Sequence, residues 1–299
     1  MKNKLIKLFL FICLILLPTF GCVRTQVPIK NSEPVTTPSK ILTGEEEFIK
    51  EKPDENQKNV INVQIQEFTN KIENDPNNPE WYVRRANQYE KLGKVDKSMQ
   101  DIDTALSIDE NFAPAYNLRG VIKALYFGKP KEGISDYTKA IDLNGMPEAY
   151  RNRAIQYIKF RKPDEALQDL TNAIKAKPDY YQAYSDRGEL LRLMEQFDLA
   201  MNDLNKSIEL NPDYYQAYIN RGVSYAQGYR NFDKAILDFK TAIKLNDKPI
   251  SAYKNLGLTY DIIGKKDEAR KYYNLVVEEG GPEHKDDIAY AKRKLKELE

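Results

Sequence analysis

The heptapeptide PDYYQAY occurs twice in this chain of 299 residues, at 178–184 and again 34 residues later at 212–218. The same period extends well beyond this pair. Six tyrosines recur at spacings of 34, 34, 34, 34 and 35 residues, namely Tyr82, Tyr116, Tyr150, Tyr184, Tyr218 and Tyr253. A period of this length is typical of a small unit that cannot bury its apolar face alone and stacks against copies of itself. The period therefore predicts a linear array of modules.

Small side chains recur at three places in each period. Four residues after each tyrosine stand Ala86, Gly120, Ala154, Gly188, Gly222 and Gly257. About sixteen residues after each tyrosine stand Ser98, Gly133, Ala166, Ala200, Ala235 and Ala269. The third set, seven residues later, is Ala105, Ala140, Ala173, Ser207 and Ala242, and Val276 is the exception in the sixth period. Small side chains let two helices approach to about 8–10 Å. Each period is therefore expected to be a pair of closely packed helices.

This pattern resembles the tetratricopeptide repeat, a 34-residue helix-turn-helix unit with small residues where its helices cross. In the numbering of that motif the tyrosine is position 4, and the small residues are positions 8, 20 and 27. The resemblance covers six units over residues 79–282, about two thirds of the chain. It implies an all-α fold, a right-handed α-solenoid of helix-turn-helix repeats. We expect a leading helix at 58–78 and a polar capping helix at 283–299 to close the array.

Two positions of the unit carry charges that change together. Position 7 holds Arg85, Arg119, Arg153, Arg187 and Arg221 in five units but Leu256 in the sixth. Position 23 holds Asp101, Asp136, Asp169, Asp203 and Asp238 in the same five units but Tyr272 in the sixth. The joint loss predicts that each arginine forms a half-buried, bidentate ion pair with an aspartate, within its unit or across to a neighbour. The alternative is an arginine ladder that binds an acidic ligand, and we favour the ion pairs because each arginine has its own counter-charge.

In tetratricopeptide-repeat proteins a concave groove is lined mainly by first-helix positions 2, 5, 9, 12 and 13. The resemblance therefore implies a peptide-binding groove that includes Val83, Asn87, Asn117, Val121, Leu125, Arg151, Ile155, Glu189, Arg192, Ile219, Val223, Lys254 and Leu258. This mixture of apolar residues and balanced charges suits an extended or helical peptide with apolar anchors. At the groove edge, Tyr180 and Tyr214 either anchor a ligand or pack over the adjoining helix ends.

Composition argues against several other functions. Beyond the first 21 residues the chain has 43 basic and 45 acidic residues, and this balance gives no electrostatic footprint for nucleic acid or for a bulk anionic surface. Both cysteines lie in the first 22 residues, which leaves the rest without a disulfide or a thiolate metal site. The single histidine, His284, is expected to be solvated or to cap the last helix. HExxH, GxSxG and Walker motifs are absent. We therefore expect no catalysis, no cofactor, no metal and no small-molecule substrate.

The N-terminal residues have the features of an export signal. Residues 1–21 combine a basic start with an apolar run from Leu8 to Leu17. The segment TFGC resembles the lipobox of bacterial lipoproteins, which implies cleavage before Cys22 and lipidation of that cysteine. A cleaved soluble signal and an uncleaved anchor are the alternatives. Residues 22–57 contain four prolines and few large apolar side chains, so we expect a disordered tether.

These features predict a protein-binding scaffold, lipid-anchored in the bacterial cell envelope, that binds peptide segments of partner proteins during assembly of envelope machinery. We expect the outer membrane, with the folded part facing the periplasm. A second hypothesis is a surface-exposed lipoprotein that binds host or extracellular molecules. A third, an enzyme, would require a polar pocket with perturbed titratable groups.

Overall fold

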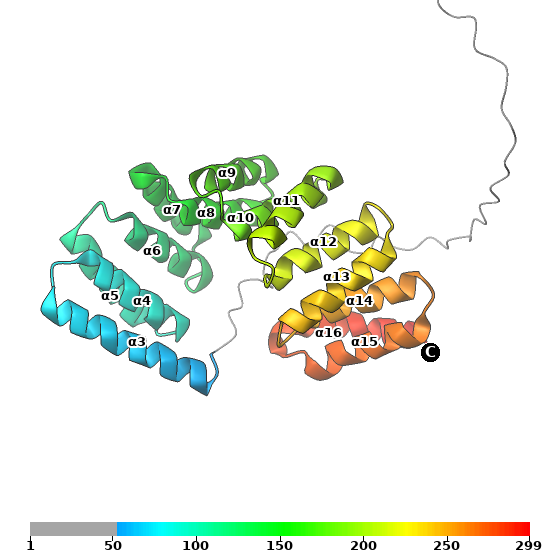
Figure 1. Cartoon of the computed structure of the whole chain (residues 1–299). Helices are drawn as coiled ribbons and strands as arrows, with labels where there is room; N and C mark the ends of the chain where they lie inside the picture. Colours follow the sequence, from blue (N-terminus) through cyan, green and yellow to red (C-terminus); the bar gives the residue numbers. More distant parts are fainter. Residues whose placement is uncertain (1–52) are drawn as a thin grey trace, which may run out of the picture. The chain divides into compact units, whose positions relative to one another are not determined.

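The computed structural model describes residues 53–299, and that range is helical throughout, without a strand (Figure 1). The helices are α3 Glu55–Asn74, α4 Pro79–Lys91, α5 Val95–Ile108, α6 Ala113–Leu125, α7 Pro130–Asn144, α8 Pro147–Lys159, α9 Pro163–Ala176, α10 Tyr181–Leu193, α11 Phe197–Leu210, α12 Tyr215–Gln227, α13 Phe232–Leu245, α14 Ile250–Ile262, α15 Lys266–Glu279, the 3₁₀ helix η1 Pro282–His284, and α16 Lys285–Glu297. The predicted all-α class is confirmed.

Consecutive helices form six hairpins, α4–α5, α6–α7, α8–α9, α10–α11, α12–α13 and α14–α15. The second helix of each hairpin also packs on the first helix of the next, and neighbouring first helices such as α4 and α6 touch. This is the repeating neighbour contact of an α-solenoid, as expected. Helix α16 packs on α15 and α14, so it takes the place of a seventh first helix.

The packing within each hairpin depends on the small residue at position 8. A Cβ atom added to Gly120 would lie 2.7 Å from the Tyr137 ring, and one added to Gly222 would lie 2.7 Å from the Phe239 ring. Where position 8 is alanine, the residue that faces it is smaller: Ala154 shares a buried cluster with Leu170. In the third and fifth units the sizes of the residues at positions 8 and 24 therefore compensate, whereas in the fourth unit Gly188 faces Leu204, and a Cβ added to Gly188 would lie 2.8 Å from that side chain.

The turn inside each hairpin contains one residue in the left-handed backbone region. This residue is Gly93, Gly128 or Gly264 in three units, and Arg161, Glu195 or Arg230 in the other three. Glycine adopts a positive φ without steric cost, whereas other residues do not. Three units therefore hold a charged side chain at a position where glycine would fit more easily.

The two ends of the array differ slightly from expectation. Helix α3 begins at Glu55, three residues earlier than the expected start at residue 58, and ends at Asn74. Asp54 accepts a hydrogen bond from the Gln57 backbone, and the Gln57 side chain accepts one from Asp54, which forms a capping box. At the other end, η1 precedes α16.

The N-terminal expectations fall largely outside the described residues. Residues 1–52 are not described, and they include the export signal at 1–21, the lipidation site Cys22 and the tether up to residue 52. Among the helices that are described, none combines the length and the apolar character needed to span a bilayer.

Candidate functional site: the first-helix face

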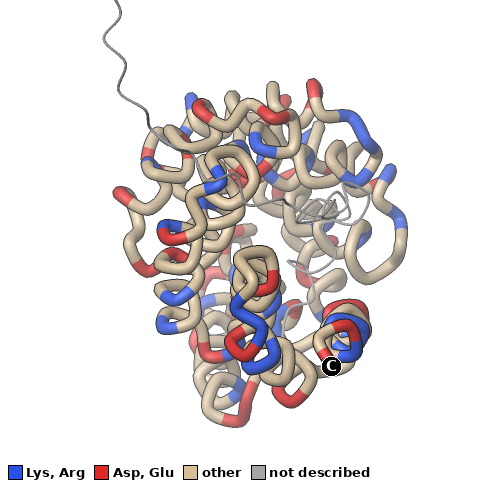
Figure 2. The backbone as a smooth tube through the Cα atoms, turned by 90° about the vertical axis from the view of Figure 1, so that its right-hand side faces the viewer, with Lys and Arg blue, Asp and Glu red and all other residues tan. Residues whose placement is uncertain are grey.

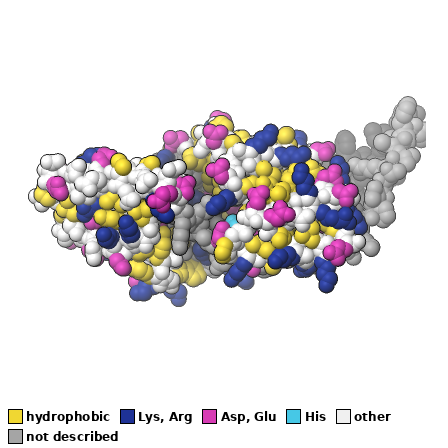
Figure 3. Space-filling view, turned by 90° about the horizontal axis from the view of Figure 1, so that it is seen from below, with side chains coloured by type: hydrophobic (Ala, Val, Ile, Leu, Met, Phe, Trp, Pro, Cys, Tyr) yellow, Lys and Arg dark blue, Asp and Glu magenta, His cyan; other side chains and the backbone are white. Residues whose placement is uncertain are grey.

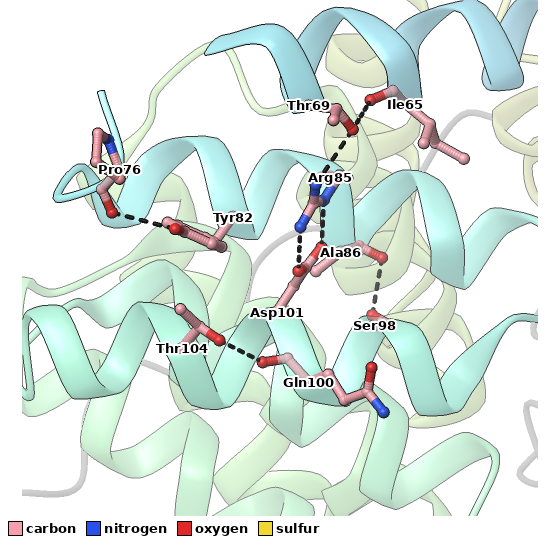
Figure 4. Close-up of polar contacts among 10 residues, drawn as sticks. All are labelled: Ile65, Thr69, Pro76, Tyr82, Arg85, Ala86, Ser98, Gln100, Asp101 and Thr104. Carbon is pink, nitrogen blue, oxygen red and sulfur yellow. Dashed lines mark hydrogen bonds and ion pairs between the residues drawn. The ribbon is translucent and has the colours of Figure 1, made fainter. Parts of the chain in front are cut away.

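Each arginine at position 7 bonds to the aspartate at position 23 of its own unit. Arg85 donates from Nε and Nη2 to the two carboxylate oxygens of Asp101, at 2.8 and 2.7 Å (Figure 4). The same bidentate geometry joins Arg119 to Asp136, Arg153 to Asp169, Arg187 to Asp203 and Arg221 to Asp238. The hydrogen bond to Asp101 raises the pKa of Arg85 above its usual value. These guanidinium groups are already neutralised, so they do not form a free ladder for an acidic ligand.

A further hydrogen bond links four of these arginines to the helix that precedes their unit. Arg85 Nη1 donates to Thr69 of α3 at 3.1 Å, and Arg153 Nη1 donates to Thr138 at 2.9 Å. Arg187 reaches Thr171 and Arg221 reaches Asn205 in the same way. By repeat register the corresponding residue before the sixth unit is Lys240, which cannot accept a bond from an arginine. Leu256 and Lys240 therefore make no such bond in the sixth unit.

The first helices of the units, α4, α6, α8, α10, α12 and α14, form the first-helix face, where the groove was expected. Polar contacts between neighbouring helices cross it. Arg151 pairs with Asp186, with Nε 2.6 Å from Oδ2, and Asn152 donates to Asn117 at 3.0 Å. Lys254 forms an ion pair with Asp287 of α16. Two of the expected groove cations, Arg151 and Lys254, therefore link adjacent helices.

Most of the other residues expected in the groove separate into two groups by burial. Val83, Ile155, Ile219 and Val223 are buried, and three of them belong to hydrophobic clusters of the array. The half-buried residues are Asn117, Val121, Leu125, Glu189 and Leu258, while Asn87 is exposed. The half-buried set is therefore better placed to contact a ligand. Figure 3 shows hydrophobic side chains lying among acidic and basic ones on one face of the molecule.

Arg192 is the least solvated charge expected in the groove. It is 5% exposed, and burial lowers its pKa. Its Nη1 donates to Gln227 of the next first helix at 2.8 Å. Its Nε has no hydrogen-bond partner within residues 53–299. This arginine thus joins α10 to α12 through a neutral amide and not through a carboxylate.

The two groove-edge tyrosines pack against neighbouring residues. Tyr180 is buried in a cluster with Ala154 and Ala183, and this burial raises its pKa to about 12. The ring of Tyr214 lies edge-on to Tyr181, with ring centroids 4.9 Å apart. This geometry favours the packing interpretation. An open cleft of about 470 Å³ lies beside them, lined by Glu148, Lys177, Asp179, Tyr180, Tyr181, Gln182 and Leu210.

His284 does not have either role expected for it. Its side chain is only 16% exposed, and it makes no side-chain capping bond to α16. It is half-buried beside Asp287, with Nδ1 3.9 Å from Oδ2. In the part of the chain that is described, no three His, Cys, Asp or Glu side chains lie close enough together to hold a metal ion. Basic and acidic residues are interspersed along the backbone (Figure 2).

Comparison with known proteins identifies the repeats. The family model of the tetratricopeptide repeat matches residues 80–112, 181–214 and 250–279, which lie in the first, fourth and sixth units. Small glutamine-rich tetratricopeptide repeat-containing protein 2 of Saccharomyces cerevisiae is 32% identical over 81 residues, which are 27% of this chain and 23% of that protein. The chain therefore contains tetratricopeptide repeats, although it spans less than a quarter of that relative.

Solved structures share the fold. The Cut9–Hcn1 hetero-tetramer of APC/C superposes with a TM-score of 0.67 at 15% identity, over 77% of this chain and 46% of that chain. The pilF protein of Pseudomonas aeruginosa superposes with a TM-score of 0.58 at 17% identity, over 71% of this chain and 97% of that chain. At these identities the likeness concerns the fold alone.

Proposed function

We propose that this protein is a lipid-anchored scaffold of the bacterial envelope that binds peptide segments of partner proteins along its first-helix face. A tetratricopeptide-repeat array is typically a protein-interaction module, and the family match supports that class. The observation that carries the choice of surface is the half-buried apolar set on the first helices, which mixes leucine and valine with polar side chains. Peptide anchors need such partly accessible apolar positions.

The proposed test of this surface uses two leucines that are half-buried on first helices. Leu125 and Leu258 belong to none of the buried clusters, so Leu125→Glu with Leu258→Glu should leave the fold intact. A buried carboxylate at a peptide anchor is strongly unfavourable. We expect crosslinking from intact envelopes, followed by purification, to recover at least tenfold less of each specific partner.

The control replaces two leucines on second helices. Leu199 and Leu237 are 53% and 64% exposed, on α11 and α13. The variant Leu199→Glu with Leu237→Glu adds the same two charges away from the first helices, and it should retain every partner. Equal recovery by both double variants would show that the first-helix face is not the binding surface.

The anchor is proposed from the N-terminal sequence. The basic start, the apolar run to Leu17 and the Gly21–Cys22 pair are what supports it. We propose the outer membrane, with the array in the periplasm. Cys22→Ser should abolish incorporation of labelled fatty acid into the protein. Incorporation that continues in Cys22→Ser would disprove this assignment.

A further inference from the structure

The turns at the two ends of the helix pairs carry opposite charge. The intra-unit turns join the first helix of a unit to its second, and the inter-unit turns join one helix pair to the next. The six intra-unit turns contain Lys94, Lys129, Arg161, Lys162, Arg230 and Lys265 against the single acid Glu195. The six inter-unit turns from α3–α4 to α13–α14 contain Asp75, Asp109, Glu110, Asp179, Asp213 and Asp247 against Lys177 and Lys248. The intra-unit turns are therefore mostly basic and the inter-unit turns mostly acidic, while the first turn of each second helix places acids such as Asp164, Glu165 and Asp198 beside the intra-unit turns.

Among the turns of the described residues, only intra-unit turns contain exposed aromatic residues. Tyr126, Phe127, Phe160 and Tyr229 lie in intra-unit turns and are between 39% and 44% exposed. Within residues 53–299, no large hydrophobic residue of an inter-unit turn is exposed. We call residues 126–129, 160–162 and 228–231 the aromatic turn edge. It combines exposed rings with four cations, and the acids Glu132, Glu165 and Asp198 on second helices contact Lys129, Lys162 and the Tyr229 hydroxyl respectively.

Two arginines of this edge occupy a strained backbone position. Arg161 and Arg230 have φ of 58° and 50°, where equivalent turns use Gly93, Gly128 and Gly264. A side chain in this region costs backbone energy, and such a cost often marks a functional position. Each arginine directly follows an exposed ring, Phe160 or Tyr229.

These arginines are also the unpaired cations of the edge. Lys129 and Lys162 lie 3.2 and 3.0 Å from Glu132 and Glu165, which neutralise them. Among the residues that the structure describes, the side chains of Arg161 and Arg230 form neither an ion pair nor a hydrogen bond; the only ring near either guanidinium is Phe232, 5.9 Å from Arg230. They are therefore available to an anion supplied by a partner.

We propose that the aromatic turn edge binds a lipid surface with anionic headgroups, which Arg161 and Arg230 contact while the neighbouring rings enter the bilayer interface. Tyrosine and basic side chains are favoured at headgroup level, where the ring is half in hydrocarbon and the cation meets lipid phosphate. The edge consists of protruding turns. The open cleft of about 470 Å³ lies instead among Tyr180, Tyr181 and Asp179, at the inter-unit turn that contains Asp179. Exposed rings beside unpaired cations fit the headgroup region of an anionic bilayer.

This proposal is independent of the peptide-binding face and of lipidation at Cys22. The test measures sedimentation of the full chain with vesicles of equal phosphatidylglycerol and phosphatidylcholine, and with vesicles of phosphatidylcholine alone. We expect stronger binding to the anionic vesicles that weakens with salt. Arg161→Gly and Arg230→Gly should each lower binding to the anionic vesicles about fivefold. Arg161→Lys should bind as the wild type does. The N-terminal residues are identical in all variants, so their contribution cancels.

The matched control is Glu195→Gly, because Glu195 has the same strained backbone, with φ of 59°, but the opposite charge. All three glycine variants should unfold at a higher urea concentration than the wild type, since the strain is relieved. Only the two arginine variants should lose vesicle binding. Equal binding of wild type and arginine variants would overturn the proposal, as would an equal loss in Glu195→Gly. Arginine-dependent binding to polyglutamate without binding to vesicles would assign the edge to an acidic protein instead.

Discussion

Arg187→Leu is expected to lower the free energy of unfolding by about 3 kcal/mol, since it removes one partner of a largely buried pair. The Arg187 side chain is 21% exposed and that of Asp203 is 9% exposed. Without the guanidinium, the Asp203 carboxylate loses both of its bonds, at 2.7 and 2.8 Å, and Thr171 loses its contact with the next unit. Urea unfolding of the full chain measures the effect.

Two variants make this prediction specific. The double variant Arg187→Leu with Asp203→Tyr copies the residues of the sixth unit, Leu256 and Tyr272, and should recover most of the lost stability. Arg84→Leu breaks the exposed Arg84–Glu80 pair and should cost less than about 0.5 kcal/mol. If the cycle of Arg187 and Asp203 shows no coupling energy, the pair does not stabilise the unit.

The fold was predictable because its determinants lie within one period. Small residues at positions 8 and 20 recur in every unit and at position 27 in five of the six, and an array has no long-range pairing to infer. The joint change at Leu256 and Tyr272 also pointed to the partners of the five arginines. The sequence left open whether each arginine pairs within its own unit or with a neighbouring unit, because that depends on the angle between the helices. The structure shows pairing within the unit.

Contacts between units were harder to foresee. The bonds from Arg153 to Thr138 and from Arg187 to Thr171 join adjacent units. A signal for them exists in the sequence, because Thr or Asn follows the paired aspartate by two residues in three units, at Thr138, Thr171 and Asn205. Similarly, the early start of α3 was signalled by a capping box at Asp54 and Gln57, within a charged segment expected to be part of the tether.

The accessibility of the groove could not be derived from position numbers. Val223 and Leu258 both occupy position 9, yet Val223 is buried and Leu258 is half-buried. The difference arises from side chains on neighbouring units, such as Tyr260, which shares the buried cluster of Val223. The exposed arginines of the aromatic turn edge were also missed, although glycine in the equivalent turns marks the backbone position that they occupy.

Gly222→Ala is expected to destabilise the protein by about 2 kcal/mol. A Cβ at this position would lie 2.7 Å from the Phe239 ring, which is fully buried and has no room to move. Overpacking of this kind costs about 1–3 kcal/mol, and it exceeds the gain of up to about 1 kcal/mol that alanine brings to a helix. Urea unfolding compared with the wild type tests the sign and the size.

The third unit supplies the compensating change, since it combines Ala154 with Leu170 where the fifth combines Gly222 with Phe239. Phe239→Leu alone should be destabilising because it leaves a cavity beside the glycine. The double variant Gly222→Ala with Phe239→Leu should be more stable than the sum of the two single effects by at least about 1 kcal/mol. Additive effects would contradict size compensation between positions 8 and 24 in the third and fifth units.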